Sequence, residues 1–312
     1  MKQGKIVVVM GGPSSEAEVS RRTGAAIVNA LESKGYAVEG MELDPPHFAE
    51  AIRKSDCAIV FNALHGRYGE DGVLQGTLDM LGIPYTGSGV LAAAVTMDKV
   101  MSKRVFLGAG ISTPRSETFH RFEFDAELPS RIRKAFSLPV VIKASSQGSS
   151  IGVAIVEKEE KLEAALKDAF RYDEEVLVEE FIRGKELTVA VWGDAREAQA
   201  FPVIEITTVS GRYDYASKYT KGASTHIIPA RIPSEVTERV QQLAVDAFRA
   251  CGCRGVARAD MMLGEDMTPY VIEINSMPGM TETSLVPDAG RAMGVEFPEL
   301  CEKILEMAGY EK

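Results

Sequence analysis

Four polar side chains toward the C-terminal end of the chain are spaced to lie together on one face of a β-hairpin. Residues 255–263 and 270–275 have the pattern of two strands joined by a polar turn. A symmetric hairpin over this turn places Asp260 opposite Glu273 and Arg258 opposite Asn275, and side chains two residues apart share a face. The pattern therefore gathers two carboxylates, an amide and a guanidinium.

This combination indicates magnesium–nucleotide chemistry. Opposed carboxylates repel each other, and a divalent cation would remove that conflict. Two carboxylates and an amide offer the oxygen ligands that Mg²⁺ takes, which makes Asp260, Glu273 and Asn275 the predicted metal ligands. Arg258 is a fixed donor fork that suits phosphate. The alternative for each residue alone is an exposed hairpin whose polar face meets water, but four on one face favour the site.

Composition limits the classes of partner. The chain has 312 residues, is 45% hydrophobic and carries a net charge of −10, which argues against nucleic acid or an anionic membrane as a partner. Four scattered cysteines are too few for a disulfide framework, so we expect reduced thiols. No segment approaches the roughly 20 apolar residues of a membrane span, and the first apolar run is too short for a signal peptide. We expect a cytoplasmic protein.

The pattern of elements predicts a mixed fold, α/β followed by α+β. Buried β-runs at 5–10, 36–43 and 57–62 alternate with helical stretches, which predicts a Rossmann-like parallel sheet up to about residue 90. A helix is expected over 97–107. The later elements are a set of strands and helices without internal repeats. We expect strands at 138–144, 151–157, 176–182, 186–192 and 197–206, and helices at 159–170, 235–250 and from about 298. The polar stretch 207–226 has the length of a lid or a disordered loop.

Two segments could contact phosphate. The loop of small residues at 145–150 joins two strands, and its backbone amides can form an anion nest with Lys143 beneath it. Its spacing is not that of a Walker A loop, and an ordinary surface turn explains it as well. Lys99 lies at a helix start, where a cation opposes the helix dipole, which suits a phosphate contact. A solvated lysine is the alternative and, taken alone, the better one.

Three further segments carry weaker signals. The extended stretch from Glu179 to Glu186 could offer its backbone to an adenine edge, with Glu186 on ribose hydroxyls; the alternative is an acidic strand end in water. Glu16 follows a strand in a Gly- and Ser-rich segment that lacks the G-x-G-x-x-G spacing, and helix capping suffices to explain it. His65 ends a predicted strand, where open α/β sheets bind ligands, although a hydrogen-bonded turn residue is the commoner case.

Taken in order, these segments resemble the D-alanine–D-alanine ligases of the ATP-grasp superfamily over nearly the whole chain. The motifs that carry the resemblance are GGPSSEAEVS, HGRYGEDG, MDK, KASSQGSSIG, EEFIRGKELTV, YASKYT, RAD and EINSMPGMTETSLVP. The resemblance implies a three-domain ATP-grasp architecture. Its expected segments are an N-terminal substrate-binding domain (1–96), a central subdomain with the phosphate-covering loop (97–184) and a C-terminal subdomain with the metal hairpin and the lid 207–226 (185–312).

The resemblance also implies roles for individual residues on the nucleotide. Lys99 and Lys143 match the lysines on the ATP phosphates, Ser150 with its loop amides matches the phosphate cover, and Lys218 is expected to reach the γ-phosphate. The expected adenine and ribose contacts are Glu179, Glu180, Ile182 and Glu186. Asp260, Glu273 and Asn275 match the ligands of two Mg²⁺ or Mn²⁺ ions.

Roles toward the amino acids follow in the same way. Glu16 matches the residue that binds the amino group of the first D-alanine, and His65 a neighbour of the second. Ser284 and Leu285 match the binders of the second carboxylate. Arg258 and the Gly279 amide match the oxyanion stabilisers. Glu16, Ser149 and Tyr219 match a hydrogen-bonded trio that ties the lid over the site.

The implied reaction is the ATP-dependent joining of two D-alanines through D-alanyl phosphate, for peptidoglycan precursor synthesis, by a homodimer. Three alternatives stay open. A ligase that makes a D-alanine–D-lactate ester is disfavoured by Tyr219, and a nucleotide-binding regulator without turnover is disfavoured by Arg258 beside the metal set. A dinucleotide oxidoreductase lacks its glycine fingerprint.

Overall fold

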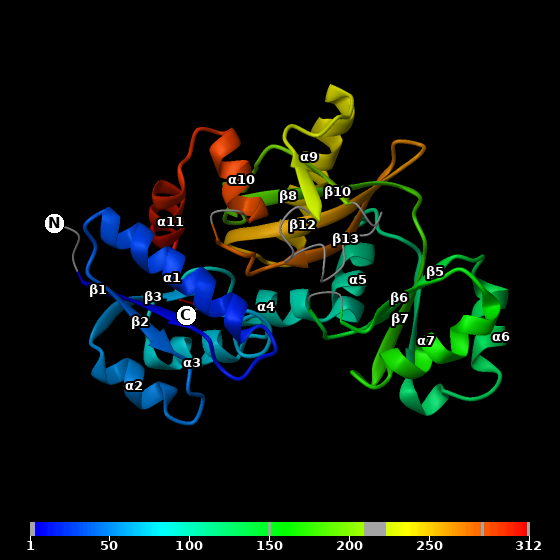
Figure 1. Cartoon of the computed structure of the whole chain (residues 1–312), viewed down its shortest axis with the longest axis horizontal. Helices are drawn as coiled ribbons and strands as arrows, with labels where there is room; N and C mark the ends of the chain where they lie inside the picture. The colour runs from blue at the N-terminus through cyan, green and yellow to red at the C-terminus, as the bar shows by residue number, and fades with distance from the viewer. Residues whose placement is uncertain (1–3, 149–150, 209–222, 282–283, 311–312) are drawn as a thin grey trace.

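The structure is a computed structural model that describes residues 4–148, 151–208, 223–281 and 284–310. The described residues form three separate β-sheets, each with its own helices (Figure 1). Each sheet falls within one of the three segments expected from the sequence, apart from Gly184 at the start of the third sheet. The mixed fold with a parallel N-terminal sheet is confirmed, whereas the domain boundaries themselves stay a prediction.

The N-terminal sheet is parallel, in the order β2-β1-β3. Its elements are β1 (Lys5–Met10), α1 (Ala17–Ser33), β2 (Val38–Glu42), α2 (Phe48–Lys54), β3 (Cys57–Asn62) and α3 (Val73–Leu81). Alternate residues of β1 face opposite sides of the sheet. Val7 and Val9 pack against α2 and α3, whereas Ile6 and Val8 pack against α1. The apolar run at the start of the chain is therefore buried on both faces, as a parallel sheet requires.

The central sheet is antiparallel, in the order β4-β7-β5-β6, and has a hydrophobic core of its own. Its elements are β4 (Ser116–His120), the 3₁₀ helix η1 (Arg121–Glu123), α6 (Leu128–Ala135), β5 (Val140–Ala144), β6 (Val153–Val156), the 3₁₀ helix η2 (Glu159–Lys161), α7 (Leu162–Ala169) and β7 (Glu175–Glu180). The buried residues of α6 and α7 cover one face of the sheet. The other face is therefore left for polar residues such as Lys143 and Glu179.

The third sheet follows the order β11-β10-β8-β12-β13, with the short β9 paired to β8. Its strands are β8 (Gly184–Gly193), β9 (Gln199–Ala200), β10 (Ile204–Thr208), β11 (Ser224–Ile227), β12 (Gly255–Gly264) and β13 (Pro269–Asn275). The helices around it are α4 (Val90–Met97), α5 (Lys99–Gly108), α9 (Ser234–Ala250), α10 (Leu285–Ala292) and α11 (Phe297–Glu306). One face is covered by α4, α5 and α9, and the other by α10 and α11.

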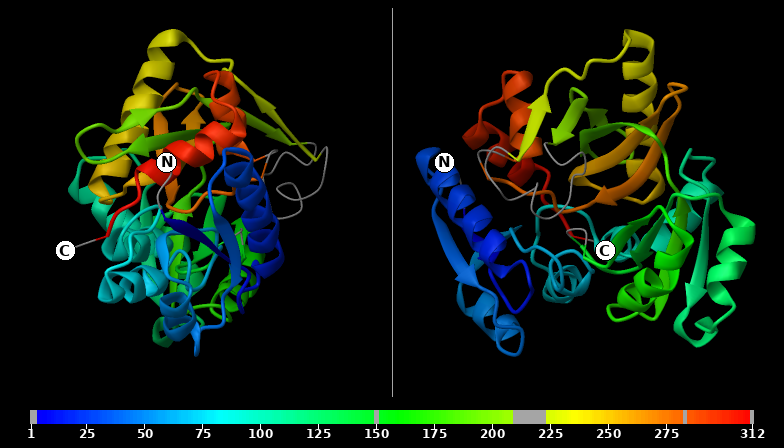
Figure 2. Two further views of the ribbon diagram at one scale, coloured as in Figure 1. Left: turned by 90° about the vertical axis from the view of Figure 1, so that its left-hand side faces the viewer. Right: turned by 45° about the vertical axis from the view of Figure 1, so that its right-hand side comes forward.

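One hydrophobic core joins the N-terminal sheet to the third sheet. It contains Ile6 and Val8 of β1, Leu31 of α1, Val256 of β12 and Leu300 of α11. The two helices α1 and α11 lie side by side (Figures 1 and 2), and Nζ of Lys34, directly after α1, lies 2.9 Å from Oε2 of Glu302 in the middle of α11. The first and third parts thus share buried surface, while the central part is packed separately.

Several element boundaries differ from those expected from the sequence. The helix expected over 97–107 starts at Lys99 and is preceded by a second helix, α4. Asp98 separates them, since its backbone is extended and its carboxylate accepts a hydrogen bond from Met101 N at 2.9 Å. The single strand expected over 197–206 is two strands, β9 and β10, and helix α10 was not expected.

The polar stretch 207–226 was expected to be structureless, and at both ends this is wrong. Thr207 and Thr208 belong to β10 and pair with Thr225 and Ser224 of β11. Residues 209–222 lie outside the described part of the chain. The expected lid is therefore anchored at both ends on a pair of antiparallel strands.

A buried carboxylate fixes the strand that leads into this hairpin. Glu205 on β10 is 3% exposed and accepts hydrogen bonds from Arg231 Nη2 at 2.7 Å and Arg231 N at 3.0 Å. Lys185 Nζ lies 3.2 Å from its Oε1. Hydrogen bonding by Arg231, followed by Lys185, lowers the pKa of Glu205 to about 2. The ionised carboxylate therefore stabilises the fold above its ordinary pKa of 4.5.

We predict that Glu205→Gln lowers the free energy of unfolding at pH 7 by about 2 kcal/mol, a figure reduced for the solvent exposure of Arg231. A folded pKa below the unfolded one gives stability that is lost as the pH falls toward 2, so the difference from wild type should shrink between pH 5 and pH 2. Urea denaturation across this pH range measures it. The exposed Glu238→Gln on α9 is the control, and a difference that does not depend on pH would contradict the assignment.

Candidate active site

The predicted hairpin register is confirmed. Asp260 on β12 pairs with Glu273 on β13, and Arg258 pairs with Asn275. The hairpin is not symmetric, however, because Met261 pairs with Val271 and leaves Ile272 as an extra residue on β13. This β-bulge lies directly beside Glu273, and bulges of this kind redirect the neighbouring side chain. The four polar residues thus share one face although the turn is offset by one residue.

Cationic groups of the chain itself offset the opposed carboxylates. Arg258 forms a bidentate pair with Asp260, with Nε 2.8 Å from Oδ1 and Nη2 2.7 Å from Oδ2. Thr188 Oγ1 donates to the same Asp260 Oδ1 at 2.6 Å, and Lys99 Nζ lies 3.6 Å from Glu273 Oε2. The expectation that a metal alone relieves the repulsion is therefore too strong, since Arg258 and Lys99 already supply positive charge.

The donor set nevertheless fits a hard divalent cation. Asp260, Glu273 and Asn275 offer carboxylate and amide oxygens, which Mg²⁺ and Mn²⁺ accept. Asn275 Oδ1 accepts a hydrogen bond from Met277 N at 2.9 Å, which fixes the orientation of the amide and leaves a second lone pair on the oxygen. Elsewhere in the described part of the chain, no cluster of three His, Cys, Asp or Glu residues could hold a metal.

The loop at 145–148, which is predicted to contact phosphate, is hydrogen-bonded at its base to the start of α5. Ser145 Oγ donates to Asp98 Oδ1 at 2.8 Å, and Lys99 N donates to Ser145 O at 2.9 Å. Lys99 Nζ donates to Gln147 O at 2.6 Å and is also close to Glu273. Lys99 thus lies between the loop and the metal hairpin, where two of the predicted phosphate-binding elements meet. A solvated lysine is excluded as its description, because only 11% of its side chain is exposed.

Lys143 on β5 and Glu179 on β7 lie on the same face of the central sheet. Lys143 Nζ forms an ion pair with Glu179 Oε2, and Glu179 is 1% exposed. The other oxygen, Oε1, lies 2.6 Å from Lys103 Nζ, so a lysine lies against each oxygen of this buried carboxylate. Sequence reasoning missed Lys103, although its position one helical turn after Lys99 places both on one face of α5.

The segment expected to contact adenine and ribose connects the central sheet to the third sheet. Glu180 ends β7, and its Oε1 accepts a hydrogen bond from Arg115 N at 2.8 Å. Ile182 lies in the extended connection, and Glu186 lies on β8 between Ile206 and Met262. All three are partly buried. An acidic strand end in water therefore does not describe this segment.

Glu16 of the N-terminal domain lies against the loop at 145–148. A Cβ on Gly148 would lie 3.2 Å from Glu16 Oε2, and one on Gly66 would lie 3.1 Å from it. His65 is 5% exposed, with Nε2 3.1 Å from Thr23 Oγ1 and Nδ1 3.5 Å from Glu70 Oε1. Burial raises the pKa of Glu70, and His65 opposes that shift. Glu16 precedes α1 but forms no side-chain cap there, so capping does not explain it.

The segment after β13 gathers the remaining predicted residues. Ser284 occupies the N-cap position of α10, but its side chain makes no capping hydrogen bond to that helix. Its Oγ instead accepts a hydrogen bond from Thr281 N at 3.1 Å and lies close to Gly279. Leu285 begins α10 and is buried. The predicted residues Ser149, Ser150, Lys218 and Tyr219 lie outside the described part of the chain, so their roles stay predictions.

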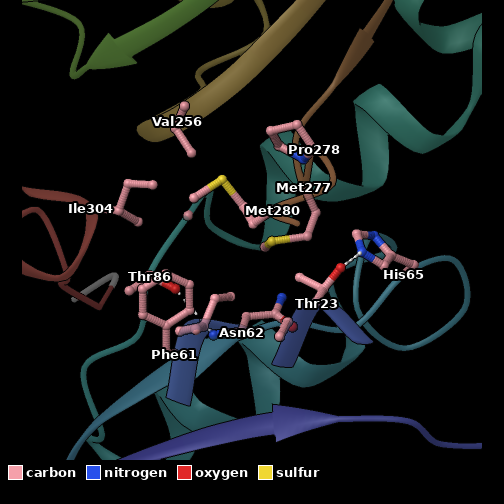
Figure 3. A pocket seen from close by; sticks show the side chains of 13 residues that line it. Thr23, Phe61, Asn62, His65, Thr86, Val256, Met277, Pro278, Met280 and Ile304 are labelled. Carbon is pink, nitrogen blue, oxygen red and sulfur yellow. Dashed lines mark hydrogen bonds between the residues drawn. The ribbon is translucent and has the colours of Figure 1, made fainter. Parts of the chain in front are cut away.

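A narrow apolar pocket lies beside these residues, between the N-terminal sheet and the loop that carries Gly279 (Figure 3). Phe61 and Asn62 of β3 line one side, Met277 and Met280 line the other, and His65 lies at one end near Thr23. Val256 of β12 and Ile304 of α11 also line it. The loop that carries Gly279 thus packs against the N-terminal sheet close to His65.

Two family models match the sequence of this chain. The model described as D-ala D-ala ligase N-terminus matches residues 37–88, and the model described as D-ala D-ala ligase C-terminus matches residues 105–306. The chain belongs to the D-alanine–D-alanine ligase family. Curated family members are similar over nearly their full length. The D-alanine–D-alanine ligase of Desulforudis audaxviator is 49% identical over 305 residues, covering 97% of this chain and 98% of the relative. That of Moorella thermoacetica is 48% identical, with 97% and 99% covered.

Solved structures of family members have the same fold. The Bacillus anthracis D-alanine–D-alanine ligase complexed with ATP matches with a TM-score of 0.83 at 33% identity, covering 98% of this chain and 97% of that chain. The VanG D-Ala:D-Ser ligase of Enterococcus faecalis matches with a TM-score of 0.83 at 31% identity, covering 98% and 99%. The family likeness thus extends over the whole chain and includes members with different second substrates.

The link between Asp98 and Ser145 allows a test of how this family member holds its loop. We predict that Asp98→Ala lowers the free energy of unfolding by about 1–2 kcal/mol, because α5 loses its N-cap and the loop loses an attachment. Ser145→Ala keeps the N-cap and removes the hydrogen bond to Asp98 together with a longer one from Val100 N at 3.4 Å, and it should cost about 1 kcal/mol. Urea denaturation of both single variants and the double variant measures the coupling. Strictly additive losses would mean that the two side chains do not interact.

Proposed function

We propose that the chain catalyses the ATP-dependent ligation of two D-alanine molecules to D-alanyl-D-alanine, releasing ADP and phosphate, for peptidoglycan precursor synthesis. The observation that carries the proposal is the hairpin register, which places Arg258, Asp260, Glu273 and Asn275 on one face. Lys99 connects this face to the loop at 145–148. Membership of the ligase family indicates which reaction this arrangement would catalyse.

In the first step, the carboxylate of one D-alanine attacks the γ-phosphorus of ATP, and D-alanyl phosphate and ADP form. Two anions must approach each other, so positive charge has to be gathered around them. We assign Lys99 and Lys143 to the ATP phosphates, Lys218 to the γ-phosphate, and Ser150 with its loop amides to the phosphate cover. Glu179, Glu180, Ile182 and Glu186 are assigned to the adenine and ribose.

Asp260, Glu273 and Asn275 are assigned as the ligands of two Mg²⁺ or Mn²⁺ ions. The ions would neutralise phosphate charge when they are bound. Arg258 is 8% exposed and is oriented by Asp260, the same carboxylate that is assigned to the metal. The chain's own contribution is to fix these groups on a rigid pair of strands.

In the second step, the amine of the second D-alanine attacks the carbonyl carbon of the acyl phosphate, and phosphate leaves. Negative charge grows on the carbonyl oxygen, and we assign Arg258 and the Gly279 N–H to stabilise it. Each such donor contributes roughly 3–4 kcal/mol to catalysis. The acyl phosphate would hydrolyse in water, so the 209–222 segment between β10 and β11 is assigned the role of a lid.

The amino acid subsites are assigned around the same loop. Glu16 is assigned to the ammonium group of the first D-alanine, and its closeness to Gly148 supports this. We assign Glu16, Ser149 and Tyr219 as the trio that ties the lid over the site. His65 is assigned as a neighbour of the second D-alanine, whose carboxylate is assigned to Ser284 and Leu285.

The second substrate is the point on which family members differ. The likeness to a D-Ala:D-Ser ligase adds D-serine to the alternative of D-lactate, whereas the curated relatives at 48–49% identity favour D-alanine. A nucleotide-binding regulator without turnover is disfavoured by Arg258, because a protein that only senses a nucleotide does not need an oxyanion donor beside Asp260, Glu273 and Asn275. No helix among the described residues is long and apolar enough to cross a membrane. We propose in addition a cytoplasmic location and a homodimer, both on the family resemblance alone.

We predict that the purified protein with ATP and Mg²⁺ converts D-alanine to D-alanyl-D-alanine, with one ADP and one phosphate per dipeptide. A panel of D-alanine, D-serine, D-lactate and L-alanine, with products identified by mass spectrometry, measures the preference. Samples treated with EDTA and then given excess Mg²⁺ control for the metal. A depsipeptide as the main product would replace the dipeptide assignment, and ATP binding without any product would favour the regulator.

We predict that Arg258→Ala lowers kcat by about 10²–10³-fold, since one oxyanion donor is removed. Arg258→Lys keeps a charge but not the donor fork, so it should recover only part of the rate. The steady-state rate of ADP formation measures both variants, and the melting temperature shows whether the fold is kept. A kcat near that of wild type in the folded Arg258→Ala variant would refute the oxyanion role.

A further inference from the structure

A third lysine, Lys103, lies buried behind the predicted phosphate-binding lysines. It is 3% exposed and sits on α5, one turn after Lys99. Its Nζ lies 2.6 Å from Glu179 Oε1 and donates to Thr113 Oγ1 at 2.6 Å and to Pro114 O at 2.8 Å. A buried ammonium with three oxygen partners has a fixed position. None of the roles assigned above uses it.

Glu179 is shared between Lys103 and Lys143. Burial on its own would raise the pKa of Glu179, but Lys143 and Lys103 hold that pKa below its ordinary value, so the carboxylate is ionised. Burial lowers the pKa of Lys103 to about 8, with Glu179 opposing the shift, so the lysine is charged at pH 7. Two ammonium groups thus face the carboxylate of Glu179, and Glu180 also acts on Lys103. Lys143 therefore shares its counter-ion with a second lysine.

Lys103 also lies where the central sheet meets the metal hairpin. Its partner Thr113 donates through Oγ1 to Val271 O at 2.7 Å, and Val271 N donates to Ser112 O at 2.8 Å. Val271 is on β13, two residues before Glu273. A continuous set of contacts therefore runs from Glu179 on β7, through Lys103, to the strand that carries the predicted metal ligands.

We propose that Lys103 is a positioning residue for the nucleotide triphosphate, which it serves by sharing Glu179 with Lys143. While Lys103 holds one carboxylate oxygen, Lys143 is only partly neutralised and its ammonium remains available to phosphate. Without Lys103, Glu179 and Lys143 form a closed neutral pair, and Lys143 is withdrawn from the phosphates. This inference rests on the proposed function, because it takes the site around Lys99 and Lys143 to be the ATP site.

Lys103→Met tests this, since methionine keeps most of the side-chain length without the charge. We expect the KM for ATP and the Kd for ADP, measured by calorimetry with Mg²⁺, to rise about tenfold or more. The kcat should stay within about threefold, and the KM for D-alanine should not change, because Lys103 does not touch the amino acids. The exposed Lys167→Met on α7 is the matched control, with no effect on either nucleotide constant.

A double-variant cycle separates positioning from a general loss of packing. In the Glu179→Gln background, Lys103→Met should change the Kd for ADP by less than about twofold, since its partner is already uncharged. In the Glu179→Gln background, Lys103→Met leaves no buried carboxylate without a partner. The double variant can therefore be measured even if the single Lys103→Met variant does not fold. A tenfold effect of Lys103→Met in both backgrounds, or no effect in wild type, would overturn the inference.

The outcomes distinguish this inference from the proposed function. If the wild-type protein binds no ADP and forms no dipeptide, the proposed function fails. If wild type binds and ligates, and Lys103→Met binds ADP as tightly as wild type, only the role of Lys103 fails.

Discussion

The opposition of Asp260 and Glu273 across β12 and β13 is the constraint around which the rest of the site is arranged. Two carboxylates that face each other on paired strands need nearby positive charge. Arg258 on β12 supplies it to Asp260, and Lys99 on α5 supplies it to Glu273. Each of these cations has a second connection. Arg258 is the predicted oxyanion donor, and Lys99 is hydrogen-bonded to the 145–148 loop. The negative charge of the two acidic groups thus brings together the parts that are predicted to bind phosphate.

The sequence allowed much of this face to be predicted because strand alternation and pairing follow simple geometry. Asp260, Glu273, Arg258 and Asn275 were placed correctly, although the bulge at Ile272 was not foreseen. An extra residue in a strand leaves no mark in the alternation of only six or seven positions. The correct pairing was reached because the assumed turn differed from the real one by the same single residue.

Residues whose neighbours come from distant segments could not be predicted in this way. Lys103 looks like an ordinary helix lysine until α5 is packed against β7 and the 112–114 segment. Glu179 was read as a possible strand end in water, and it is almost completely buried. Asp98 and Ser145 lie in two of the motifs, and nothing in those motifs showed the hydrogen bond that joins the two side chains. Burial and long-range pairing depend on the tertiary fold, which local pattern does not contain.

The core shared by α1, α11 and both outer sheets has a consequence for how the protein is made. Tyr85 N donates to Gly309 O at 2.9 Å, Gly309 N donates to Tyr85 O at 3.1 Å, and Tyr36 donates to Glu302, so residues 302–309 complete the N-terminal part of the fold. On the ribosome, the α1 side of the N-terminal sheet can be fully buried only after α11 has been made. The central sheet, whose core lies within residues 119–178, can finish folding first. The nascent chain is therefore expected to order its middle before its beginning.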